Sequence, residues 1–139
     1  MRRTFLWIQL VLAALVALGV WLQVYFIAAY FFGAEDALDL HEAIGGIFIH
    51  GFEVLAFLVS FGAWWRNWGK IAYAFGFALL GTVQIFFTGG DDWVGGFHGL
   101  LALAVLVMAV FMVKQNAEEL GLTRGRSVDV DSAPPPPLP

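Results

Sequence analysis

The sequence lacks cysteine altogether, which excludes disulfides, thiolate metal sites and iron–sulfur clusters. Charged residues are also scarce: they make up 13% of the 139 residues, whereas hydrophobic residues make up 60%. Soluble domains contain only roughly 45–50% apolar residues. The seven Lys and Arg residues are scattered and form no basic patch, so nucleic acid is not an expected partner. This composition predicts an integral membrane protein, whose first partner is the lipid bilayer.

Four long apolar runs follow one another along the chain. They cover about residues 4–32, 40–65, 69–88 and 93–113. Each is long enough for the roughly 20 helical residues that cross a bilayer. The first run also exceeds the apolar segment of about 7–15 residues found in signal peptides, so we expect it to be retained. Because the loops between the runs are short, neighbouring helices should be antiparallel.

The predicted fold is therefore all-α: a polytopic membrane protein with an antiparallel four-helix transmembrane bundle over residues 1–115. The segment 116–139 is polar and ends in a proline run. Such a segment cannot bury enough apolar surface to fold by itself. We expect it to form a disordered cytoplasmic tail.

The basic residues all fall on one side of the predicted bundle, and none falls on the other. They are Arg2, Arg3, Arg66, Lys70, Lys114, Arg124 and Arg126. The opposite side carries the acidic residues Glu35, Asp36, Asp39, Asp91 and Asp92. Loops rich in Lys and Arg stay in the cytoplasm. The predicted location is therefore a bacterial inner membrane, crossed several times, with both termini in the cytoplasm.

The two halves of the chain resemble each other. The first half contains "LQVYF", an acidic loop and "LHEAIGGIFI"; the second contains "VQIFF", an acidic loop and "FHGLLALAVL". Gln23 then matches Gln84, and His41 matches His98. The match is short, so it has two interpretations: duplication of a helical hairpin, or chance similarity between apolar segments. Duplicated hairpins of one orientation are related by an axis along the membrane normal, which would place the two histidines at the same depth.

His41 and His98 are the candidate ligands of a cofactor. Imidazole is a common axial ligand of haem iron, and the core of a helical bundle is a common cofactor site. The hypothesis is that both histidines coordinate one haem b, with Gly45 and Gly99 leaving room for the macrocycle. The alternative is that both are interfacial histidines in contact with water.

His50 and Glu53 form a separate polar pair at membrane depth. On a regular helix His50 lies on the face opposite His41 and about 13 Å deeper, whereas Glu53 shares the face of His50. Gln23 and Gln84 are further polar residues within the spans. Ionisable groups inside a membrane are usually functional. The alternatives for the pair are a proton relay, the polar edge of a quinone site, a docking contact for a partner helix, or a neutral hydrogen-bonded pair without further role.

The motifs "LQVYF", "DLHEAIGG", "VQIFF" and "FHGLLAL" resemble a family of small four-helix bacterial membrane proteins over about residues 5–115. More loosely, the plan is similar to b-type cytochrome membrane bundles, including the cytochrome b561 type and one half of haem A synthase. That resemblance implies haem-ligand roles for His41 and His98 alone. The chain departs from two-haem cytochromes because it has no second histidine pair near the inner face.

Three functions are compatible with these features. The favoured one is a haem-b-binding electron-transfer or redox subunit that works with a membrane redox partner or a larger complex. The alternatives are a structural accessory subunit of such a complex, and a small proton or solute transporter that uses His50 and Glu53. No nucleophile constellation or phosphate-binding loop is present, so standalone enzymatic activity is not expected.

Overall fold

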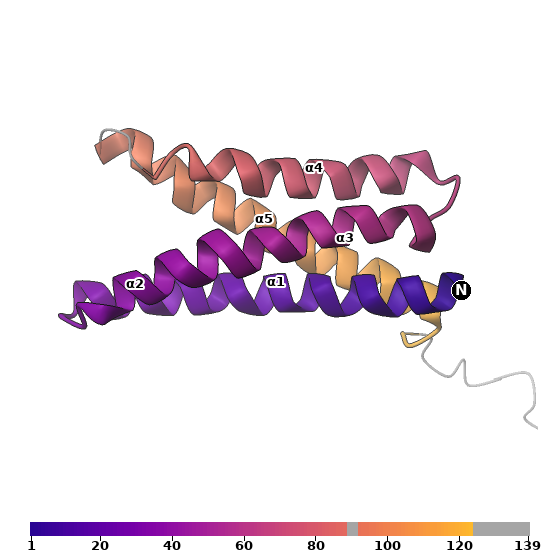
Figure 1. The fold of residues 1–139 in the computed structure, drawn as a ribbon, viewed down its shortest axis with the longest axis horizontal. Helices are drawn as coiled ribbons and strands as arrows, with labels where there is room; N and C mark the ends of the chain where they lie inside the picture. The colour runs from indigo at the N-terminus through magenta and orange to yellow at the C-terminus, as the bar shows by residue number, and fades with distance from the viewer. Residues whose placement is uncertain (89–91, 124–139) are drawn as a thin grey trace, which may run out of the picture.

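The computed structural model describes residues 1–88 and 92–123, and every regular element in these ranges is helical. The elements are α1 (Arg2–Phe31), α2 (Asp36–Ala43), η1 (Ile44–Ile49), α3 (His50–Ala63), α4 (Trp68–Ile85) and α5 (Asp92–Leu120). Because α2, η1 and α3 follow one another without a break, they form one long rod. Four rods therefore lie along one another (Figure 1). The all-α prediction is confirmed for the described part of the chain.

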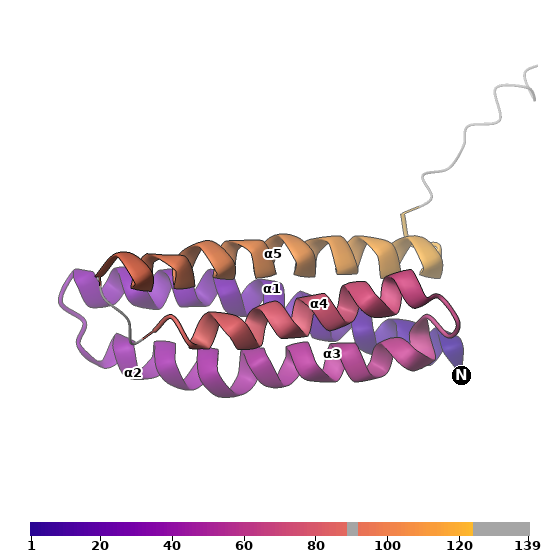
Figure 2. The same cartoon turned by 90° about the horizontal axis from the view of Figure 1, so that it is seen from above.

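The rods are arranged as a bundle in which two pairs are diagonal. α1 packs against α3 and α5, and α4 packs against the same two helices. Hence α1 faces α4 across the bundle, and the rod of α2, η1 and α3 faces α5. Figures 1 and 2 show the N-terminus, the α3–α4 turn and the end of α5 gathered together, which we name the basic end. The α1–α2 turn and the start of α5 form the opposite end, which we name the histidine end.

Three helical segments are long and apolar enough to cross a membrane: Arg2–Phe31, Asp36–Ala63 and Trp93–Leu120. These correspond to the first, second and fourth predicted spans. The third predicted span corresponds to α4, which has 18 residues. α4 carries the polar residues Lys70 and Gln84 near its two ends.

The core follows from the helical periodicity of the apolar residues. On α1 the buried residues recur every three or four positions: Leu6, Gln9, Ala13, Val16, Gly19, Val20 and Gln23. This spacing places them on one face of the helix. Ala13, Ala56, Ala74 and Ala109 are all fully buried, one from each rod. Small residues at such positions allow the backbones of membrane helices to approach closely.

The end of α5 differs from the boundary predicted after residue 115. The helix continues to Leu120, because Asn116 and Leu120 are buried against the bundle and Glu119 forms ion pairs with two other helices. The remainder of the predicted tail from residue 124, with Arg124 and Arg126, lies outside the described residues. So does Asp91 in the second acidic loop.

Candidate functional site

His41 and His98 meet across the bundle at the histidine end. His41 belongs to α2 and His98 to α5, which are on diagonal rods. The centres of the two imidazole rings are 6.2 Å apart, and the ring planes are inclined at 64°. Both residues are partly buried. The structure therefore brings together the two candidate ligands that the sequence repeat matched.

Each histidine makes the same contact within its own hairpin. His41 Nδ1 lies 3.2 Å from the backbone oxygen of Gln23, and His98 Nδ1 lies 3.1 Å from the backbone oxygen of Gln84. A carbonyl oxygen can only accept, so Nδ1 carries the proton and donates it. The lone pair then remains on Nε2, which is the arrangement found in metal-binding histidines. We name these four residues the histidine layer.

The side chains of the two glutamines are buried but incompletely paired. Both polar atoms of the Gln23 carboxamide and Oε1 of Gln84 have no hydrogen-bond partner among the described residues. Buried polar groups are nearly always hydrogen-bonded, and each exception calls for an explanation. A polar ligand bound in the same layer as the two imidazoles would supply partners for these amides.

The two candidate glycines differ in what surrounds them. A Cβ atom on Gly45 would lie 3.2 Å from Oε1 of Gln23, so the missing side chain leaves space for that carboxamide. A Cβ on Gly99 would have no neighbour within 4 Å in the described part of the chain. Gly45 therefore accommodates a side chain of the histidine layer, and Gly99 borders open space.

The apolar core stops close to the histidine layer. On the basic-end side of this layer, the first buried hydrophobic residue along each rod is Val20, Ile49, Ala78 or Val105 among the described residues. Beyond them, toward the histidine end, the described chain buries only one more hydrophobic residue, Ala37. The four rods therefore continue past the layer without a tightly packed interior.

The second polar pair lies deeper in the bundle and is enclosed. His50 Nδ1 is 2.8 Å from Glu53 Oε2; the His50 side chain is 14% exposed and the Glu53 side chain is fully buried. Glu53 Oε1 has no hydrogen-bond partner within residues 1–88 and 92–123. A Cβ on Gly81 of α4 would overlap the Glu53 carboxylate, so this glycine provides the space that the carboxylate occupies.

The helix between the two histidines of this rod is not regular. The six residues of η1 form a π-helix, in which hydrogen bonds join each residue to the fifth one along. Such a segment adds a residue to the turn and rotates the following side chains back by about 100°. The prediction that His50 lies opposite His41 assumed a regular α-helix between them, and η1 does not have that geometry. The two remain up to about 13 Å apart along the rod, at 1.5 Å per residue.

Gln9 is a buried polar residue that was not predicted from the sequence. Its Nε2 donates to the backbone oxygen of Ala56 over 3.1 Å, which links α1 to α3, whereas its Oε1 has no partner among the described residues. Its position at three- and four-residue spacing from Leu6 and Ala13 was the available signal.

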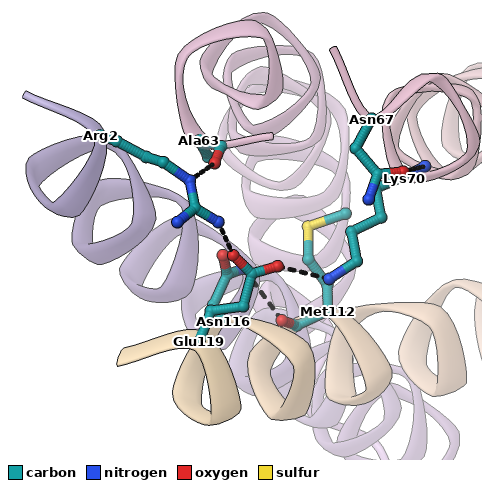
Figure 3. A network of polar contacts seen from close by, with 7 residues as sticks. All are labelled: Arg2, Ala63, Asn67, Lys70, Met112, Asn116 and Glu119. Atoms are coloured by element: carbon teal, nitrogen blue, oxygen red, sulfur yellow. Dashed lines mark hydrogen bonds and ion pairs between the residues drawn. The ribbon is translucent and has the colours of Figure 1, made fainter. Parts of the chain in front are cut away.

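At the basic end a polar network connects the helices (Figure 3). This network was not predicted from the sequence. The Glu119 carboxylate of α5 accepts from Arg2 of α1 and from Lys70 of α4. Arg2 Nε also donates to the backbone oxygen of Ala63 at the end of α3, over 3.1 Å. One carboxylate and one guanidinium therefore connect all four rods. Pairing between residues so distant in sequence leaves no local signal.

The described residues contain no cluster of three or more His, Asp or Glu side chains placed to bind a metal ion. Two imidazoles alone leave most metal ions with an incomplete set of ligands, since Zn²⁺ normally takes four. Haem iron is different, because the macrocycle itself supplies four nitrogens and the protein adds only axial ligands. A pair of histidines is therefore suited to haem rather than to a bare ion.

No family model, curated protein or solved structure matches this chain.

Proposed function

We propose that this protein is a membrane electron-transfer or redox subunit that binds one haem b between His41 and His98. The observation that carries this proposal is the 6.2 Å separation of the two ring centres. Imidazole nitrogens bind transition metals at about 2 Å, and each ring centre lies about 1 Å behind its nitrogen, so two axial imidazoles have ring centres about 6 Å apart. The 6.2 Å spacing is compatible with a shared metal and supports the proposal.

The surroundings of the histidines also fit a haem group. Both Nδ1 atoms are engaged by backbone oxygens, which leaves Nε2 for the iron. The unpaired carboxamides of Gln23 and Gln84 can bond polar edges of a ligand. When bound, haem would supply a reversible one-electron couple. The role of the chain is then to hold and orient the group and to exclude water from it.

The same proposal includes four membrane spans with both termini in the cytoplasm. α4 is the remaining span, the third in chain order. Its 18 residues extend about 27 Å at 1.5 Å per residue, and it packs between α3 and α5. The described basic residues Arg2, Lys70 and Lys114 support a cytoplasmic basic end. The membrane is a bacterial inner membrane, and the haem lies near its outer face.

The partner of such a protein is another membrane redox protein or a larger complex, to which it passes one electron at a time. The loose similarity to b-type cytochrome bundles supports this role. A single haem near one face cannot carry electrons across the whole bilayer by itself, so a partner must complete any such path.

The test of haem binding is a difference spectrum. The full chain is expressed with ample haem supply, purified in detergent and compared in its dithionite-reduced and oxidised forms. We expect the absorption bands of a six-coordinate b-type haem and about one haem per chain. A protein that carries no haem under these conditions would contradict the proposal and favour the accessory-subunit alternative.

The topology is tested separately by labelling cysteines with a membrane-impermeant maleimide in intact cells. The native chain has no cysteine, so each introduced thiol is the only one present. Ala34→Cys, in the α1–α2 turn, should react from outside, whereas Gly69→Cys, near the α3–α4 turn, should react only after the cells are opened. Both positions are exposed in the structure. The reverse pattern would contradict the assigned orientation.

A further inference from the structure

The interior of the bundle holds very few ionisable side chains between the histidine layer and the basic end. The segments that enclose this region are Thr4–Val24, Ala43–Ala63, Ile71–Ile85 and Gly99–Val113. They contain three ionisable residues: His50, Glu53 and Tyr73. The Tyr73 hydroxyl donates to the backbone oxygen of Met108 over 2.8 Å and is thereby engaged. His50 and Glu53 are the remaining two, and they contact each other.

We infer that the His50–Glu53 pair is a proton-binding site linked to the oxidation state of the cofactor held by His41 and His98. This inference rests on the proposed haem site. When an electron from an external reductant enters the protein, the proton affinity of the pair rises, and the fraction of molecules in which the pair holds a proton from water increases. On reoxidation the electron leaves, the proton affinity falls and the additional protons return to water.

The geometry of the pair provides a route for the proton. His50 is the partly exposed member and Glu53 the enclosed one. A proton taken up by His50 Nε2 can be matched by donation from Nδ1 to Glu53 Oε2, which is 2.8 Å away. An imidazole can perform this relay because its two nitrogens exchange donor and acceptor roles.

No other ionisable group in the described helices shares this position. α1 presents the amide of Gln9, and its Thr4–Val24 segment has no ionisable side chain. α4 presents Gly81 against the carboxylate, and the only ionisable side chain in its Ile71–Ile85 segment is Tyr73. η1 and the Gly99–Val113 segment of α5 have none. Within the segments named above, a charge added at the histidine layer therefore acts chiefly on this pair. Asp39 and Glu42, next to His41, are exposed at the histidine end, where water screens their charges.

The expected strength of the coupling follows from the separation along the rod. The pair lies up to about 13 Å from His41. One unit charge at that distance in a protein interior of effective dielectric constant near 20 changes proton affinity by about tenfold. Glu53 is shielded from water, so solvent does not screen this interaction as it would at the surface.

The test is a redox titration of the haem-loaded full chain at a series of pH values. Reduction adds negative charge and so favours the protonated pair, which means that the midpoint potential should be higher at low pH than at high pH. A tenfold change in proton affinity corresponds to a total difference of about 59 mV for a one-electron couple. Glu53→Gln should remove this difference without changing haem content, whereas the control Tyr73→Phe should retain it.

A second variant and a second measurement keep the inference testable if Glu53→Gln does not fold. His50→Gln should also remove the pH dependence. In the unmodified protein, the reduced-minus-oxidised infrared spectrum should contain a carboxylic-acid band that shifts in D₂O. A midpoint potential that is independent of pH in the unmodified protein, or a pH dependence that both variants retain in full, would overturn the inference but leave the haem proposal intact. Absence of haem would overturn both.

Discussion

The two ends of this bundle are built differently. Toward the basic end, the four rods enclose a continuous core that includes Phe77, Trp64 and Met112, and Glu119 connects helices through ion pairs. Toward the histidine end, the described chain buries almost no apolar side chain beyond Ala37. The same four rods are therefore tightly joined at one end and loosely packed at the other.

Because of this difference, we expect the basic end to determine the stability of the fold and the histidine end to bind the cofactor. A packed core stabilises a bundle without leaving space for a ligand, because protein interiors are as dense as organic crystals. A site for a large planar cofactor needs the opposite, namely residues whose contacts the ligand completes. The unpaired carboxamides of the histidine layer have this character. We expect substitutions to affect folding at the basic end and cofactor binding at the histidine end.

Truncation of a core phenylalanine should show the largest difference between the ends. Phe77 is fully buried, so Phe77→Ala should lower the free energy of unfolding by about 3–5 kcal/mol. The matched control at the end of the same helix is Phe86→Ala, since Phe86 is 80% exposed; its effect should stay within about 0.5 kcal/mol. Unfolding in mixed detergent micelles, followed by circular dichroism, measures both. Equal losses in the two variants would mean that the packed core does not hold the fold.

Two glycines of α4 give an intermediate effect. In Gly81→Ala the added methyl group would overlap the Glu53 carboxylate, so we expect a loss of about 1–3 kcal/mol from overpacking. Gly76→Ala adds the same methyl group where no described atom lies within 4 Å, and should be neutral or stabilising by up to about 1 kcal/mol. Combining Gly81→Ala with Glu53→Ala should restore part of the loss. A Gly81→Ala protein as stable as Gly76→Ala would show that the carboxylate does not occupy this space.

The ion-pair network should contribute the smallest amount. Glu119→Ala removes the partner of both Arg2 and Lys70, but these groups are partly exposed, so we expect a loss of about 1 kcal/mol or less. The control is Glu118→Ala, whose carboxylate lies 3.9 Å from Lys114 on the exposed face of the same helix. Thermal unfolding at low and high salt distinguishes them. The difference between the two variants should shrink with added salt; a difference that grows with salt would contradict an electrostatic origin.

Part of this organisation could be predicted from the sequence. The length of the four apolar runs and the short loops between them predicted the all-α architecture, because these signals are local. The internal repeat was enough to pair His41 with His98, since equivalent positions in two hairpins fall at one level. The same local reasoning could not predict that His41 and His98 contact the backbone oxygens of Gln23 and Gln84. Every residue has a backbone oxygen, so the sequence does not indicate which one is contacted.

Other features depend on contacts between distant residues. The role of Gly81 becomes apparent only when Glu53 of another helix lies against it. The role of Glu119 likewise depends on its contacts with Arg2 and Lys70. The π-helical turn of η1 was also missed, since it is a change of one residue in an otherwise helical sequence. A π-helical segment of this kind rotates the side chains that follow it by about 100°, so the positions of residues after η1 could not be derived from regular helical geometry.

The most direct test of haem coordination compares haem content among three alanine substitutions, each expressed with ample haem and purified in detergent. His41→Ala and His98→Ala should each abolish the six-coordinate b-type spectrum or reduce haem content severely, because each removes one of two axial ligands. His50→Ala, which alters the deeper pair, should retain most of the haem. Full haem occupancy with an unchanged spectrum in either His41→Ala or His98→Ala would contradict coordination by this pair.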